Sequence, residues 1–285
     1  MSGDSPEGRT PAENAELALL LEVAGTPKPG NVDRERDLGD LRFEHFLAGA
    51  VGARRGLELA ASGAPVGEAF ERGVAGMSVQ SGGNTQFGAL LLLVPLVKAT
   101  VERELTQTGA TAVVEATTAE DAAAFYRAFE HVDVFVGDRP EDVSAPDVDE
   151  GADAVDEIRE EGLTMYDVLA QTPAENGISD EWVGGFRRTF EAADGLRSRS
   201  GPVTARAAAT YLDLLAEAPD ALVARRNGKG VARQVMVRAQ EAREGDLAHV
   251  RAFAEALVRE GINPGATADL VAAGLFVALE RGLEV

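Results

Sequence analysis

The chain has 285 residues, of which 45% are hydrophobic but only 5% aromatic, so its core must consist mainly of alanine, leucine and valine. Alanine and leucine are strong helix formers, which favours a helical protein. There is no cysteine, and this excludes disulfides and thiolate metal sites. The length is enough for one large domain or two small ones.

Acidic residues outnumber basic ones by 48 to 27, which gives a net charge of −21, and only three of the basic residues are lysines. A lysine-poor acidic surface suits a cytoplasm rich in salt, because the Debye length falls to about 3 Å at 1 M and self-repulsion is screened. The acidity is spread along the chain, so we expect a halophilic cytoplasmic protein rather than one with a local acidic binding surface. Nucleic acid is a poor partner for such a surface.

Neither the N-terminal residues nor the apolar segments of the sequence predict a contact with a membrane. Residues 1–10 are polar and lack a basic-then-apolar leader, so we expect a disordered tail there and one helical domain over residues 11–285. The most apolar run, Ala89–Val97, is too short to span a bilayer. We therefore expect a soluble intracellular protein.

Apolar residues recur at helical spacing through most of the chain. We expect helices at residues 12–24, 43–61, 66–79, 89–104, 117–130, 164–169, 180–193, 203–216, 231–243, 246–260 and 264–280. Two of them, 89–104 and 264–280, are apolar on most sides and should be the buried central helices. The predicted fold class is all-α, a single-domain multi-helix bundle.

Two segments do not fit the helical pattern. Residues 131–136 alternate polar and apolar side chains, which is typical of a strand, although no partner strand is evident. Residues 138–156 are rich in Asp, Glu and Pro, and we expect a surface loop or a lid there.

A polar loop, Thr26-Pro27-Lys28-Pro29-Gly30-Asn31-Val32-Asp33-Arg34, follows the first helix. Each proline favours an extended conformation in the residue before it, so the helix must end here. The loop carries an ammonium, an amide, a carboxylate and a guanidinium within seven residues. It is either a Pro-Gly turn that ends a helix or a ligand-binding loop.

Two further polar stretches lie just before the apolar helices. Gly82-Gly83-Asn84-Thr85-Gln86-Phe87-Gly88 can offer backbone N–H groups to an anion, or Asn84 or Thr85 can simply cap the helix. Asn263 and Pro264 suit the start of the last helix, but capping does not explain Asp269 among Ala, Leu and Val. A carboxylate there needs a cation, a metal or several hydrogen-bond donors. An arginine that forms a buried salt bridge with it could be the cation.

The remaining polar features are less distinctive. Residues 224–230 place three cations around two glycines, which fits a helix C-terminus or a phosphate clamp equally well. The three histidines have no metal-ligand spacing, and the glycine signatures of P-loop and dinucleotide-binding proteins are absent. Oxygen ligands for Mg²⁺ could come from Asp33, Asp37, Asp40 and Asp269.

Taken together, these stretches resemble the triphosphoribosyl-dephospho-CoA synthase family, in the family's order and over most of the chain. The matching pieces are Glu22-Val23 with residues 26–34, Gly83-Asn84-Thr85 with Gly88-Ala89, Arg225-Arg226-Asn227-Gly228, and Asn263-Pro264-Gly265 with Ala268-Asp269-Leu270. The segment Ser179-Asp180-Glu181-Trp182 is similar to a divergent archaeal branch.

The resemblance implies an all-helical transferase that uses ATP and 3′-dephospho-CoA, releases adenine and joins the triphosphoribosyl group to the 2′-hydroxyl of the acceptor. It implies that Asp33, Asp40 and Asp269 hold Mg²⁺ or act in catalysis, since carboxylates stabilise the cationic anomeric carbon. The residues that it implies for ATP and substrate binding are Lys28, Asn31, Arg34, Asn84, Thr85, Gln86, Arg226 and Asn263.

The sequence departs from the family pattern at two places. The family has a Gly-x-His-x-Asp-Met run after the first motif and His-Lys after Asn-Thr, where this chain has Asp37-Leu38-Gly39-Asp40-Leu41 and Gln86-Phe87. These changes leave the acceptor substrate open. The alternatives to a transferase are a nucleotide-binding protein of the same fold without turnover and a scaffold whose polar loops only cap helices. A homo-oligomer is compatible with the sequence.

Overall fold

The structure is a computed structural model that describes residues 8–136, 143–171 and 177–285. The first helices along the chain are α1 (Pro11–Ala24), α2 (Phe43–Ala61), α3 (Val66–Met77), α4 (Phe87–Glu102), α5 (Gln107–Glu115), α6 (Ala119–Ala128), the 3-10 helix η1 (Val148–Ala154) and α7 (Val155–Glu161). The others are α8 (Met165–Ala170), α9 (Gly177–Val183), α10 (Arg187–Ser198), α11 (Val203–Glu217), α12 (Ala221–Asn227), α13 (Lys229–Glu244), α14 (Leu247–Arg259) and α15 (Gly265–Glu280). No strand forms within these ranges, which confirms the all-α prediction.

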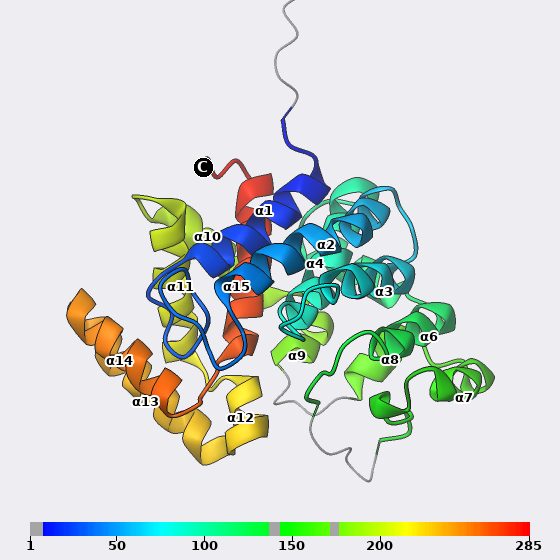
Figure 1. The fold of residues 1–285 in the computed structure, drawn as a ribbon. Coiled ribbons are helices and arrows are strands. Elements are labelled where there is room, and N and C mark those ends of the chain that lie inside the picture. The colour runs from blue at the N-terminus through cyan, green and yellow to red at the C-terminus, as the bar shows by residue number, and fades with distance from the viewer. Residues whose placement is uncertain (1–7, 137–142, 172–176) are drawn as a thin grey trace, which may run out of the picture.

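Two apolar helices, α4 and α15, form the centre of the molecule, as expected. The last helix, α15, packs against α1, α4, α10 and α11, and nearly all of its side chains are buried. In Figure 1 it runs through the middle of the molecule, with α10 and α11 on one side and α2 and α4 on the other. The helix α4 in turn contacts α2 and α3. Asp269, in the second turn of α15, is thus carried by one of the most buried helices of the protein.

The first helix begins and ends where the sequence predicts. Thr10 and Glu13 form a capping box at its start, and Pro11 occupies the first helical position. The helix ends at Ala24, ahead of a cis peptide bond between Thr26 and Pro27. The polar loop therefore leaves directly from the buried end of α1.

Several predicted elements are wrong. Residues 131–136 form no strand, since no other segment is available to pair with them. The helix predicted at 180–193 is two helices, α9 and α10, because the chain turns at Gly185 and Phe186, both of which have positive φ. Asn263 does not cap α15, because Pro264 occupies that position and the Asn263 side chain bonds elsewhere. The short helices α5, α7 and α12 were not predicted.

Two predictions fall partly outside the described residues. Most of the disordered tail expected over residues 1–10 lies there, and so does part of the predicted lid, at 137–142. The rest of the predicted lid forms η1 and the start of α7. The assignment of one domain to residues 11–285 stays a prediction.

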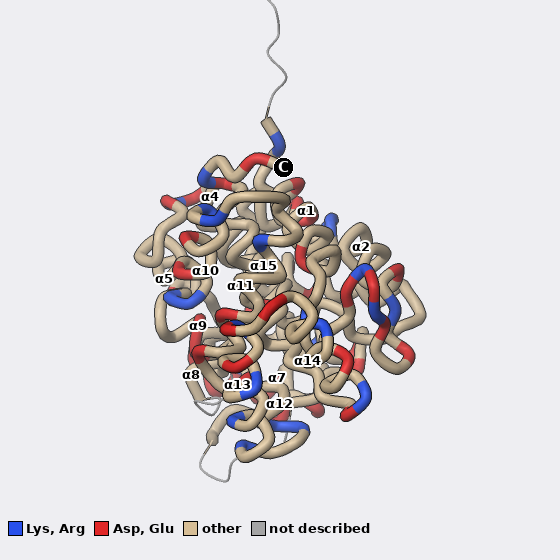
Figure 2. The backbone as a smooth tube through the Cα atoms, turned by 90° about the vertical axis from the view of Figure 1, so that its left-hand side faces the viewer, with Lys and Arg blue, Asp and Glu red and all other residues tan. Residues whose placement is uncertain are grey.

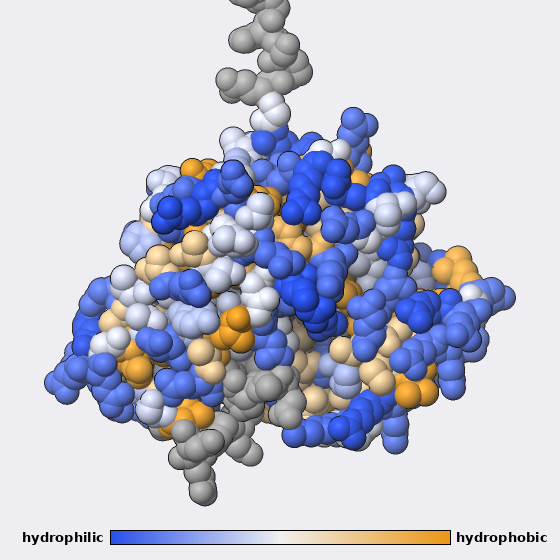
Figure 3. Space-filling model, turned by 180° about the vertical axis from the view of Figure 1, so that it is seen from behind, coloured by the Kyte–Doolittle hydropathy of each residue, from blue (hydrophilic) through white to orange (hydrophobic). Residues whose placement is uncertain are grey.

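The surface is polar and acidic. Figure 2 shows Asp and Glu distributed over all parts of the described chain rather than in one patch. Seen from behind in Figure 3, hydrophobic residues form only scattered patches among hydrophilic ones. Among the helices in the described ranges, none is long and apolar enough to cross a membrane.

Helices α2 and α3 approach each other through glycines. A Cβ added to Gly52 would lie 2.1 Å from the Gly76 carbonyl oxygen, and one added to Gly76 would lie 2.0 Å from that of Gly52. Real Cβ atoms do not approach a carbonyl oxygen so closely, so the two backbones touch only because both residues lack a side chain.

Replacing Gly52 by alanine should therefore destabilise the protein by about 1–3 kcal/mol, because the two helices must separate. A matched control is Gly230→Ala in α13, where nothing lies within 4 Å of the added methyl group. This control should stabilise by about 0.4–1 kcal/mol through the unfolded state. Chemical denaturation measures both, and equal stability of the two variants would contradict the close contact.

Candidate active site

Two adjoining cavities lie where the polar loop, α4, α12 and the start of α15 meet. Their volumes are about 230 Å³ and about 90 Å³. The residues that line both are Leu41, Asn84, Phe87, Gly88, Leu222, Asn263 and Asp269. Segments that are far apart in the sequence thus enclose one site.

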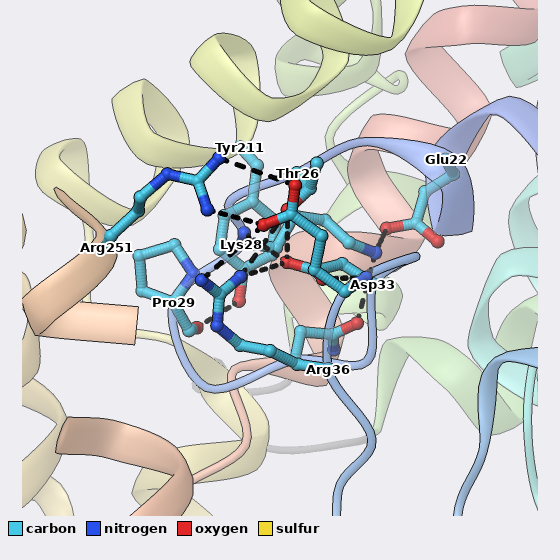
Figure 4. Close-up of polar contacts among 10 residues, drawn as sticks. Glu22, Thr26, Lys28, Pro29, Asp33, Arg36, Tyr211 and Arg251 are labelled. Atoms are coloured by element: carbon cyan, nitrogen blue, oxygen red, sulfur yellow. Dashed lines mark hydrogen bonds and ion pairs between the residues drawn. The ribbon is translucent and has the colours of Figure 1, made fainter. Parts of the chain in front are cut away.

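The polar loop reaches the smaller cavity through a chain of side chains, of which Figure 4 shows the first pair, Lys28 and Glu22. Lys28 is fully buried, and its ammonium group pairs with Glu22 of α1. The same ammonium donates a 3.2 Å hydrogen bond to Asn31 Oδ1, and Asn31 Nδ2 donates to Asn263 Oδ1 at 2.9 Å. Glu22, Asn31 and Asn263 line the cavity, whereas Lys28 lies behind them.

Asp33 holds the loop in shape. Its Oδ2 accepts hydrogen bonds from the Thr26 hydroxyl at 2.9 Å, the Lys28 N–H at 3.0 Å and the Arg36 guanidinium at 2.9 Å. Its Oδ1 accepts from the Glu35 N–H at 2.8 Å. Because this buried carboxylate is already surrounded by donors, it is occupied in fixing the loop.

The polar loop packs directly on the start of α15. Gly30 has a φ of 74°, and a Cβ on it would lie 2.3 Å from the Ile262 carbonyl oxygen. The Tyr211 hydroxyl is shared between the carbonyl oxygens of Pro29, at 2.9 Å, and Pro264, at 3.3 Å. Burial raises the pKa of Tyr211 well above its usual value, so this hydroxyl stays a donor. These contacts bring the first and last sequence motifs together.

Asp269 stands in the wall of both cavities. Burial raises the pKa of its carboxyl well above the usual range, and the nearby charges of Glu22 and Asp220 raise it further. A backbone hydrogen bond from Ala89 and the charge of Arg225 act in the opposite direction. Gly88 makes room for it, since a Cβ there would lie 2.2 Å from Asp269 Oδ2. Asp269 is therefore a carboxyl that keeps its proton to a higher pH than an ordinary aspartate.

Four buried polar atoms around the cavities have no hydrogen-bond partner within the described part of the chain. They are Thr85 Oγ1, Gln86 Oε1, Ser179 Oγ and Arg225 Nε. The first two belong to residues that line the smaller cavity, and the other two to residues that line the larger one. An unpaired buried polar group costs about 1–3 kcal/mol, so this arrangement points to a polar ligand.

The larger cavity has an apolar end built from aromatic rings. The ring of Phe129 lies with its centroid 5.0 Å from that of Phe87 and 5.2 Å from that of Phe125. At the rim, the Arg226 guanidinium lies 5.0 Å from the centre of the Phe135 ring. The site thus offers an apolar surface at one end and carboxyl, amide and guanidinium groups at the other.

Comparison with known proteins gives the family of the chain. A family model described as CitG, ATP:dephospho-CoA triphosphoribosyl transferase, matches residues 8–284. The chain belongs to the CitG family. It is therefore an enzyme, a transferase of this family.

A solved structure agrees with the family model. The chain is 28% identical to an Archaeoglobus fulgidus protein whose crystal structure is described as a triphosphoribosyl-dephospho-CoA synthase, with a TM-score of 0.70. The match covers 85% of this chain and all of the other. Among curated proteins, none matches this chain. The family resemblance of the sequence is thus confirmed, whereas the archaeal branch stays a prediction.

The two cavities bring together most of the site residues predicted from the sequence. Those that line one or both cavities are Asn31, Asn84, Thr85, Gln86, Arg226, Asn263 and Asp269. Lys28 and Asp33 lie behind the wall, in the buried loop network. Arg34 and Asp40 are exposed and belong to the lining of neither cavity as the described residues form it.

The predicted Mg²⁺ ligands do not come together. Within the described ranges, no group of three carboxylates or histidines is placed to hold a metal ion. Asp33 is occupied by four donors and Asp40 is exposed, which leaves Asp269 alone at the cavity. The donor set thus does not fit a Mg²⁺ site formed by protein ligands.

Three residues at the site were not singled out from the sequence: Glu22, Arg225 and Gly88. All three belong to the family motifs quoted above, but nothing local indicates that Glu22 pairs with Lys28 or that the charge of Arg225 acts on Asp269. A polar residue near the buried end of an apolar helix was the only signal for Glu22. For Gly88 the signal was a glycine at the start of a buried helix, where a close approach is expected.

The Lys28–Glu22 pair generates a stability prediction. Lys28→Met should destabilise the protein by about 3–5 kcal/mol, because it leaves a buried carboxylate without its cation. Burial already raises the pKa of Glu22 against the opposing charge of Lys28, so the loss of Lys28 should raise it further. A raised folded-state pKa gives stability at low pH that is lost as the pH rises. The deficit should therefore be larger near pH 8 than near pH 5.

The double variant Lys28→Met/Glu22→Gln is the control. It removes both charges, so it should recover at least about 2 kcal/mol of the loss and show a weaker dependence on pH. Urea denaturation at the two pH values measures these differences. A double variant as unstable as Lys28→Met would show that packing, and not the buried charge, dominates.

Proposed function

We propose that the two cavities form the active site in which this CitG-family enzyme transfers the triphosphoribosyl group of ATP to dephospho-CoA or a related acceptor, with release of adenine. The observation that supports this assignment best is Asp269, a half-buried carboxyl of raised pKa in the wall of both cavities. Its surroundings include unpaired polar atoms on both sides, at Gln86 and Arg225.

In this proposal the aromatic end of the larger cavity takes the adenine ring of ATP. The apolar faces of Phe87 and Phe129 suit a flat base, and Arg226 at the rim adds a positive charge. Arg225 is partly buried next to Asp269, and a triphosphate would supply the acceptor that its Nε lacks. Asn84 and Asn263 lie between the two ends and would orient the ribose.

Asp269 would supply the proton that adenine needs. As the bond between the ribose C1′ and adenine breaks, adenine takes the bonding electrons and receives a proton, while positive charge builds at C1′. A carboxyl of raised pKa keeps its proton to a higher pH than an ordinary aspartate and can act as this general acid. The acceptor hydroxyl then bonds to C1′ and releases one proton, so turnover is neutral in protons overall.

Two features support a catalytic protein in place of one that only binds nucleotide. Family membership extends over residues 8–284, and the site retains a carboxyl of perturbed pKa. The family's His-Lys pair is replaced by Gln86 and Phe87, of which Gln86 lines the smaller cavity and Phe87 lines both. We propose that this change affects the choice of acceptor, because it alters the wall and leaves Asp269 in place.

We also propose that the enzyme works in the salt-rich cytoplasm of a halophilic archaeon. The support is its composition, with a net charge of −21 and three lysines. Whether it forms a homo-oligomer there stays a prediction.

Asp269→Asn should lower adenine release in the presence of ATP and dephospho-CoA by about 10²–10⁴-fold, because the amide cannot donate the proton. The wild-type rate should fall as the pH rises through the raised pKa of Asp269, since only the protonated form is active. Asp194→Asn, at an exposed carboxylate of α10, is the matched control and should keep the wild-type rate. The rates are measured as free adenine by chromatography. Full activity of Asp269→Asn would refute the role of Asp269 as the general acid.

Salt dependence tests the halophilic proposal. The midpoint temperature of unfolding should rise steadily between about 0.1 M and about 2 M KCl, as screening reduces the repulsion among carboxylates. Sucrose at matched osmolality is the control, because it stabilises by exclusion without screening charge. If KCl raises the midpoint no more than sucrose does, the acidic composition has another origin.

A further inference from the structure

Within the described part of the chain, two carboxyl groups line the smaller active-site cavity, those of Glu22 and Asp269. Glu22 stands near the end of α1 and Asp269 in the second turn of α15, and these two helices pack against each other. In the proposed reaction Asp269 protonates adenine. A base must also take the proton that the acceptor hydroxyl loses as it bonds to C1′. The second carboxyl at the cavity is the natural candidate for this base.

The contact with Lys28 favours the ionised form of Glu22. The Lys28 ammonium is fully buried and pairs with Glu22 Oε1, and an opposite charge in contact stabilises a carboxylate. Burial raises the pKa of Glu22 against this charge, so the carboxylate is a stronger base than that of an ordinary glutamate. A general base must lose its proton before the reaction and hold one during it, and these surroundings suit both states.

One oxygen of Glu22 is left for a ligand. Among the residues that the structure describes, the hydrogen bond of the Glu22 side chain goes to Oε1, and Oε2 accepts none. Figure 4 shows one carboxyl oxygen of Glu22 at the Lys28 ammonium and the other pointing away from it. An ionised carboxylate has room for several donors. A hydroxyl in the smaller cavity can therefore donate to Oε2 while the ion pair stays intact.

The two carboxyls have different surroundings, which divides the roles between them. Burial is the first cause of the raised pKa of Asp269, and the negative charge of Glu22 is the next. The ionised Glu22 thus helps Asp269 to keep its proton. In glycoside hydrolysis with inversion, one carboxylic acid protonates the leaving group while a carboxylate takes a proton from the attacking water. Asp269 and Glu22 offer the same two protonation states at one cavity.

We propose that Glu22 is the general base of the transfer and that the acceptor hydroxyl enters the smaller cavity to donate to it. This assignment rests on the proposed function. The acceptor oxygen bonds to C1′ of the triphosphoribosyl group, and its proton passes to Glu22 Oε2. The bond between C1′ and adenine breaks, and adenine takes the bonding electrons and the proton of Asp269. The transfer of one proton from Glu22 to Asp269 then restores both groups.

The test uses a nucleophile that needs no base. Azide carries no proton, so it can bond to C1′ in place of the hydroxyl, whereas the departing adenine still needs a proton. With ATP and dephospho-CoA, Glu22→Gln should release adenine about 10²–10⁴-fold more slowly than the wild type and bind ATP as tightly. Sodium azide should raise the rate of Glu22→Gln by about tenfold or more, but not that of Asp269→Asn. Sodium chloride at the same concentration controls for ionic strength.

Two further variants separate a base from a structural group. Glu16→Gln is the matched control and should keep the wild-type rate, because Glu16 also lies on α1 and pairs with an arginine, yet lines none of the three cavities. Glu22→Gln leaves the buried Lys28 without its partner, so Lys28→Met/Glu22→Gln is measured beside it. This double variant has no unpaired charge, and it should show the same slow release and the same response to azide.

The inference is overturned if the two Glu22 variants keep the wild-type rate, or if both lose it and azide restores neither. It is also overturned if azide raises the rate of Asp269→Asn as much as that of Glu22→Gln. An active wild type with fully active Glu22 variants refutes the base and leaves the proposed function standing. If the wild type releases no adenine with either nucleophile, the proposed function fails and the inference fails with it.

Discussion

The buried ion pair between Lys28 and Glu22 is the interaction on which the site depends. It joins the end of α1 to the polar loop where neither charge can reach water. Lys28 also donates to Asn31, which in turn donates to Asn263. The cavity wall is therefore positioned by a charge pair one layer behind it. In this structure the Lys28 ammonium contacts Glu22 and Asn31, and its predicted contact with phosphate stays a prediction.

The burial of three carboxyl groups is a second constraint on the structure around the site. Glu22, Asp220 and Asp269 lie in one part of the protein, and in each burial is the first cause of a raised pKa. Each is stabilised differently: Glu22 by a lysine, Asp220 by Thr267 and backbone N–H groups, and Asp269 by a single backbone N–H and the charge of Arg225. Glu22 and Asp220 each accept a hydrogen bond from a side chain, whereas Asp269, the carboxyl at both cavities, is stabilised by a backbone N–H and a nearby charge. The same cost of burial is thus offset by a different kind of donor at each carboxyl.

The sequence predicted the all-α fold and the central helices, because a helix that is apolar on most sides must be buried. It indicated Asp269 for a physical reason, as a carboxylate inside an apolar helix needs an explanation. It could not show the depth of Lys28, which depends on a partner in another element. Arg34 and Asp40 carry suitable groups, yet both are exposed. Arg34 lies in a turn closed by a bridge between Asp33 and Arg36, and Asp40 in one closed by a bridge between Leu38 and Leu41. The alternation of polar and apolar side chains at residues 131–136 did not indicate a strand. A strand also needs a second segment to pair with, and the alternation of one segment carries no information about a partner.

The position of α12 connects these observations. This helix is only seven residues long, and it lies between the larger active-site cavity and another cavity of about 470 Å³. Both walls carry cationic and acidic side chains. Its start is fixed by Asp220, which accepts from the Val223 N–H at 3.0 Å and from Thr267 of α15. Because Thr267 and Asp269 are two residues apart on α15, the contact that anchors α12 also holds the segment of α15 that carries Asp269. A single short helix, held at its start, thus forms part of the wall on which the Asp269 cavity depends.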